Sequence, residues 1–132
     1  MSEANVSRAL IYLEKVVEEH HLLVERLENL VLLDEPDEEE TVRVLKELRN
    51  KRRELYESFK TIAENLEYVT YRQTREEALG LLNYYYAVML PDEINVLSEV
   101  PKKANLSHLK EDIEKDIAMI NRIKKLIIQF VY

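Results

Sequence analysis

Helix-breaking residues are rare in this chain, which has one glycine and three prolines among 132 residues. Sheets need turns at short intervals, and turns are rich in glycine and proline, so this scarcity favours long helices. Apolar residues make up 46% of the chain and charged residues 34%, a mixture typical of patterned helices rather than of disordered segments. The composition therefore predicts an all-α fold.

Two long segments place apolar residues at alternating spacings of four and three, which indicates one buried helix face. In the first segment, residues 6–33, this seam consists of Val6, Leu10, Leu13, Val17, His20, Val24, Leu27 and Val31. In the second, residues 38–72, it consists of Leu45, Leu48, Arg52, Leu55, Phe59, Ile62, Leu66 and Val69. Each seam contains one polar residue, and Asp37 is expected to cap the second helix.

The rest of the chain is expected to form helices over residues 75–90, 92–100 and 106–131. Thr74 is expected to cap the first of these helices, and Pro91 to end it. We therefore predict an antiparallel helical bundle of four main helices plus one short helix, forming a single domain over residues 1–132.

The polar residues of the two seams, His20 and Arg52, are predicted to share a layer of the core. The turn between the first two helices centres near residue 35, so the two residues lie within one helical turn of the same level. A buried arginine needs partners, and the candidates are Asp116 on the inner side of the last helix and Glu19. We predict a polar core layer of His20, Arg52 and Asp116. Three interpretations are open: a register-fixing layer, an arginine whose stem packs while its head reaches solvent, or an acid–base or ribonucleolytic pair.

Basic residues gather on the second helix, where residues 41–75 carry a net charge of +4 in a chain of net charge −7. A stripe along one face consists of Arg43, Lys46, Arg49, Arg53, Tyr56 and Lys60. Three interpretations stay open. The stripe holds nucleic-acid backbone, with Tyr56 stacking on a base; it balances the acids of the first helix; or it contacts an acidic protein.

Metal and nucleophilic chemistry find little support. Glu18 and His21 have the E-x-x-H spacing of carboxylate-bridged bundles, but such sites need a second pair, and His108 has no glutamate three residues before it. Cysteine is absent, which excludes disulfides and thiolate ligands. Serines lack a recognisable triad motif, and a single glycine rules out glycine-rich phosphate loops. We expect a protein that is not an enzyme and holds no cofactor or metal.

Consecutive tyrosines in the segment "NYYYAVML" suggest an interface, because tyrosine offers a large area with a polar tip. The candidate interface residues are Tyr84, Tyr85, Tyr86 and Met89, and Gly80 and Ala87 nearby allow close helix approach. The leading functional prediction is an interaction or assembly protein that forms a homo-oligomer or docks to a protein partner. The alternative is a small all-α subunit that binds nucleic-acid backbone through residues 43–60, within a larger nucleoprotein complex.

The uncharged segment of residues 78–90 spans about 20 Å as a helix, short of the roughly 30 Å hydrocarbon core of a bilayer. The N-terminal residues lack the pattern of a secretory signal. We therefore expect a soluble, cytoplasmic protein with no membrane partner. High Glu and Lys content without cysteine resembles a thermophilic protein, although eight asparagines count against that interpretation.

Overall fold

The computed structural model describes residues 2–131, which form an all-α bundle without strands, as predicted. The α-helices are α1 (Ser2–Val31), α2 (Glu38–Asn65), α3 (Arg72–Tyr84), α4 (Leu90–Glu99) and α5 (Lys110–Val131). Three short 3₁₀-helices, η1 (Leu66–Tyr68), η3 (Val100–Lys102) and η4 (Ala104–Leu109), lie between them, and η2 (Tyr85–Met89) is a π-helix. Among the described residues, none of the helices has the combination of length and apolarity that crossing a bilayer requires.

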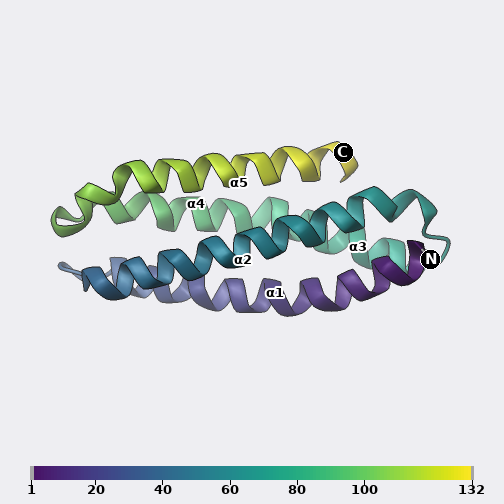
Figure 1. The fold of residues 1–132 in the computed structure, drawn as a ribbon, viewed down its shortest axis with the longest axis horizontal. Coiled ribbons are helices and arrows are strands. Elements are labelled where there is room, and N and C mark those ends of the chain that lie inside the picture. The colour runs from purple at the N-terminus through teal and green to yellow at the C-terminus, as the bar shows by residue number, and fades with distance from the viewer. Residues whose placement is uncertain (1, 132) are drawn as a thin grey trace.

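The helices form two hairpins that pack on each other (Figure 1). The antiparallel helices α1 and α2 make the first hairpin, and α3 and α4 together make the second with α5. Between the hairpins, α2 contacts α5 and α1 contacts α4. Helices adjacent across this boundary run parallel, as the colour gradient shows, so the bundle is antiparallel within each hairpin and parallel between them.

The seams predicted for the first two helices lie in the core. Most of their apolar members are less than 9% exposed, but Val16 is buried in place of the predicted Val17, which is half-buried. Asp37 caps α2, because its Oδ1 accepts a hydrogen bond of 3.2 Å from the backbone N–H of Glu40. The side chain of Glu40 forms ion pairs with Arg26 of α1 and Arg43 of α2.

The end of α2 differs from the prediction. The helix stops at Asn65 rather than residue 72, and Val69 has an extended backbone. The sequence after Glu67 is aromatic and β-branched, a composition that loses side-chain freedom in a helix. Val69 remains 6% exposed, so the seam is buried there without helical structure.

The third helix is a continuous rod over residues 72–99 rather than two helices divided at Pro91. It begins at Arg72, so Thr74 lies inside the helix, and the predicted cap at Thr74 is wrong. Pro91 does not end the helix, because the π-helix precedes it. The N–H of Leu90 donates to the carbonyl of Tyr85, five residues back. Pro91 then stands in the first turn of α4, where a missing N–H is tolerated.

The π-helix shifts the buried face of the rod by one residue, since a π turn accommodates one extra residue. Before and within it, the buried positions are Ala78, Leu82, Tyr85 and Met89. Continued at spacings of three and four, this pattern would next bury Asp92 and Val96. The structure instead buries Leu90, Glu93, Leu97 and Val100. The shift turns the carboxylate of Glu93 into the core.

Polar contacts fix the end of the bundle where α1 meets α2. Asn105 in η4 donates from Nδ2 to the carbonyl of Pro36 over 2.7 Å. Nε2 of His108 lies 2.8 Å from Oε1 of Glu38. These contacts join η4 to the segment where α2 begins, and α5 starts at Lys110 rather than at residue 106 because residues 104–109 form η4.

Candidate functional site

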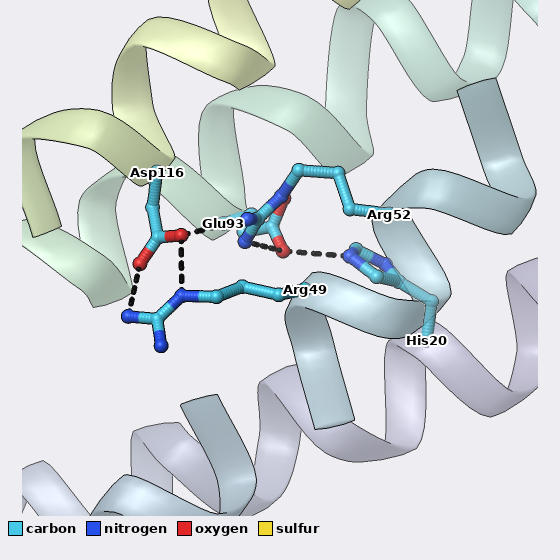
Figure 2. A network of polar contacts seen from close by, with 5 residues as sticks. All are labelled: His20, Arg49, Arg52, Glu93 and Asp116. Carbon is cyan, nitrogen blue, oxygen red and sulfur yellow. Dashed lines mark hydrogen bonds and ion pairs between the residues drawn. The ribbon is translucent and has the colours of Figure 1, made fainter. Parts of the chain in front are cut away.

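A network of charged side chains crosses the core, and α1, α2, α4 and α5 each contribute to it (Figure 2). His20 of α1 lies with Nε2 2.6 Å from Oε2 of Glu93 on α4. Arg52 of α2 donates from Nη2 to the same oxygen over 3.2 Å. Its Nη1 donates to Oδ1 of Asp116 on α5 over 3.0 Å. Arg52 therefore links the two carboxylates, one from each helix of the second hairpin.

Arg49 completes the network from the surface side. Its Nε donates to Oδ1 of Asp116 over 2.8 Å, and its Nη2 donates to Oδ2 over 2.9 Å. Such two-point pairing of guanidinium and carboxylate is stronger and more specific in direction than a single contact. Arg49 and Arg52 are three residues apart on α2, so both reach one carboxylate of α5.

Burial and charge together set the protonation of this network. Burial raises the pKa of the Glu93 carboxyl, but the charges and hydrogen bonds of His20 and Arg52 outweigh burial and hold this pKa below its ordinary value. Burial opposes the charge on Arg52, yet Glu93 and Asp116 raise the pKa of the guanidinium above its ordinary value. Glu93 and Arg52 therefore stay charged at neutral pH.

Tyr85 lies beside this network. Its ring centroid is 5.9 Å from that of His20 and 4.7 Å from that of Phe59. Burial is the main reason that the pKa of its hydroxyl is well above the ordinary value. Four buried atoms here have no hydrogen-bond partner among the described residues: His20 Nδ1, Arg52 Nε, Tyr85 OH and Glu93 Oε1. Such atoms reduce stability, so the network is a costly feature of the core.

The structure brings together the three residues of the predicted polar core layer, His20, Arg52 and Asp116, all at most 4% exposed. Sequence reasoning missed Glu93, since the one-residue shift of the π-helix was not anticipated. It also placed Arg49 on the exposed stripe rather than in the network. At 0% and 1% exposure, His20 and Glu93 have no contact with solvent, so a substrate has no access to an acid–base pair there.

The predicted basic stripe does not form one free positive face. Arg49 is held by Asp116, Arg43 pairs with Glu40 of its own helix, and Arg53 donates to Asn50 over 2.8 Å. Tyr56 is half-buried, whereas Lys46 and Lys60 are exposed. Beside the stripe, Lys51 pairs with Glu19 of α1 over 2.5 Å.

The candidate interface of tyrosines divides between core and surface. Tyr85 is fully buried and Met89 is 7% exposed, so neither is free to meet a partner, and their place in the interface is wrong. The physical reason is that both lie on the buried seam of the rod. Tyr84 is 52% exposed, and Tyr86 is half-buried with Lys124 Nζ 5.5 Å from its ring centroid.

The E-x-x-H pair lies on the outside of α1. Glu18 is exposed, and Nε2 of His21 lies 3.4 Å from Oε1 of Glu25, one turn further along the helix. In the part of the chain that the structure describes, no three His, Cys, Asp or Glu side chains are grouped so as to hold a metal ion.

Comparison of the chain with models of protein families, with curated proteins and with solved structures finds no match. The functional proposals below therefore depend on the geometry and chemistry of its own surfaces.

Proposed function

We propose that the protein is a non-enzymatic assembly protein that associates with a second copy of itself. The contact surface is the outer face of the rod at residues 80–88, here called the rod face. Its exposed members are Gly80, Asn83, Tyr84, Ala87 and Val88. No charged residue occurs between Glu77 and Asp92, although a third of the chain is charged.

Gly80 is the observation that carries this proposal. It is the chain's single glycine, it is exposed, and it lies inside α3, where glycine costs about 0.5–1 kcal/mol relative to alanine. A Cβ added at this position would meet nothing within 4 Å. Packing inside the subunit therefore gives no reason for a glycine. The close approach of a backbone from another subunit would be a reason for a glycine at this position.

A second copy suits this face. The chain has a net charge of −7, so two copies repel each other where their charges meet and least where a surface is uncharged. Gly80 and Val88 are equally far from Tyr84 along the sequence. A two-fold axis near Tyr84 would thus place Val88 of each copy over Gly80 of the other.

The interface is small. The rod face spans about 12 Å along the helix, and stable dimers usually bury about 800 Å² on each partner. We therefore expect association that depends on protein concentration. The burial of His20 and Glu93 supports a role without catalysis.

Replacing Gly80 by glutamine tests the proposal, because glutamine is uncharged, larger and a better helix former. We expect Gly80→Gln to raise the free energy of unfolding of the monomer by about 0.5 kcal/mol and to weaken association at least ten-fold. Sedimentation equilibrium over a range of concentrations measures the association. Denaturant unfolding at low concentration measures the stability.

Asn29→Gln is the matched control, since Asn29 is exposed on α1 and glutamine also improves helix propensity there. It should leave association unchanged. The proposal is wrong if the native protein stays monomeric at every concentration, or if Gly80→Gln associates as tightly as the native protein.

A further inference from the structure

A groove runs between the parallel helices α2 and α5, on a different part of the surface from the rod face. Two adjoining hollows of about 330 and 440 Å³ form it, and both are lined by Met119. We propose that this α2/α5 groove binds single-stranded nucleic acid through its phosphate backbone.

The charge of the groove is opposite to that of the chain. Its basic residues are Arg49, Arg52, Arg53, Lys115, Arg122 and Lys125, and its only acids are Asp112 and Asp116. The chain as a whole has a net charge of −7. A hollow between α1 and α2, by contrast, is lined by Glu54 and Glu57 with Arg53 as its single base. Lys124 and Lys125 also line a neighbouring hollow without acids, so positive charge gathers along α5 and its groove with α2, where low-dielectric walls strengthen the field.

Ion pairing cancels only part of this charge. Arg49 and Arg52 are paired with Asp116 and Glu93. Within the described residues, Lys115, Arg122 and Lys125 are exposed and have no ion pair with an acid. No acidic residue follows Asp116 in the sequence, so the second half of α5 contributes bases alone.

The side chains that line the groove between its basic residues favour a nucleic acid over an acidic peptide as the ligand. Tyr56, Met119 and Leu126 are half-buried and give the groove an apolar floor. The ring of Tyr56 offers a surface on which a nucleobase of a single strand can stack, while phosphates follow the cations. The groove follows α5 from residue 112 to residue 129, about 25 Å. Being concave, it suits one strand better than a duplex.

The sequence pointed to the basic residues of α2 alone. The structure replaces that stripe by a groove with two walls. Arg53 and Tyr56 of the stripe lie on one wall, and basic residues of α5 lie on the other. Arg43, Lys46 and Lys60 do not line these two hollows.

Fluorescence anisotropy with a labelled oligo-dT and an oligo-U of about fifteen nucleotides tests the proposal. Four exposed basic residues (Arg53, Lys115, Arg122 and Lys125) predict about four phosphate contacts. Affinity should then fall about 50-fold between 50 and 200 mM salt. A poly-glutamate peptide of similar length is the competitor that represents an acidic protein partner.

Two double variants distinguish the effect of the groove's charge on binding from the effect of the chain's net charge. Arg122→Glu with Lys125→Glu should reduce affinity at least 20-fold at low salt. Arg8→Glu with Lys15→Glu changes the net charge equally on α1, which does not line the groove, and should change affinity less than three-fold. Tyr56→Ala should weaken binding roughly five-fold or more, whereas Tyr56→Phe keeps the ring and the affinity. Thermal unfolding of each variant shows that it is folded.

Several results would overturn the proposal. One is an anisotropy of either oligonucleotide that does not change at low salt. A second is an equal loss of affinity in the α1 and α5 pairs, which would indicate general charge attraction. A third is poly-glutamate that binds as tightly as oligo-dT, which would assign the groove to an acidic protein instead.

Discussion

Glu93 is the fully buried carboxylate of the network, and its one oxygen Oε2 contacts both His20 and Arg52. Removing one partner of a buried ion pair leaves an uncompensated charge, which costs about 3–5 kcal/mol. At the surface, loss of one charge usually changes stability by less than about 0.5 kcal/mol. The environment of this single carboxylate thus decides the effect of a substitution.

Glu93→Gln should therefore lower the free energy of unfolding by about 3–5 kcal/mol at neutral pH. The substitution should also flatten the pH dependence. The pKa of Glu93 is lower in the folded state, so its stabilisation is complete above the ordinary value of 4.5 and is lost as pH falls through the folded value. Denaturant unfolding at several pH values between neutral and acid measures both effects.

Asp92→Asn is the control, because Asp92 is the exposed neighbour of Glu93 on the same helix. We expect a change of less than about 0.5 kcal/mol at neutral pH. Equal losses in the two variants would show that the network contributes no more to stability than a surface charge.

Part of this site could be predicted from the sequence. His20 and Arg52 interrupt apolar seams, and a polar residue on a seam is visible in the periodicity alone. Glu93 could not be found this way, since it lies in the first turn of α4, where an acid normally favours the helix dipole. Its burial depends on the π-helix, which shifts the register of the rod.

The rod shows how one element sets the geometry of the site. If the π-helix accommodates one extra residue, deleting one residue there and removing the proline should leave a regular helix with Glu93 still facing the core. We expect a variant with Ala87 deleted and Pro91→Ala to unfold cooperatively, within about 1–2 kcal/mol of the native protein. Circular dichroism during thermal and denaturant unfolding measures this.

Deletion of Asn95 is the matched control, because Asn95 is also exposed and lies on the same rod beyond the π-helix. This deletion rotates Leu97 and Val100 away from the core. It should cost at least about 2–5 kcal/mol, the usual cost of losing one large core side chain. If both deletions are equally harmful, the π-helix is not the insertion that we infer.

The other elements show which features of the fold periodicity can predict. The seams of α1 and α2 identify their buried faces, since burial alone produces that spacing. The predicted end of α2 was wrong because Leu66 and Val69 stay buried in non-α-helical structure, so the seam continues past the helix. Pro91 was misinterpreted because its effect depends on the hydrogen bonds of the preceding turn.

At the scale of the whole molecule, the network joins the two hairpins. His20, Arg49 and Arg52 come from the first hairpin, and Glu93 and Asp116 come from the second. The apolar contacts between hairpins are not directional, whereas charge pairs fix one relative position. We therefore expect the network to select the register in which α2 lies beside α5, the register that forms the walls of the groove.

Replacing the whole network by apolar residues separates stability from specificity. In a variant with His20→Leu, Arg52→Met, Glu93→Leu and Asp116→Leu, Arg49 is left half-exposed and can turn to solvent. We expect this variant to be at least as stable as the native protein, as is common for buried ion pairs, whereas Arg52→Met alone costs about 3–5 kcal/mol. Without charge pairs, however, the hairpins can slide. The variant should then give additional or broadened amide resonances in a two-dimensional ¹H–¹⁵N spectrum. A single set of sharp resonances would show that apolar packing alone specifies the arrangement of the hairpins.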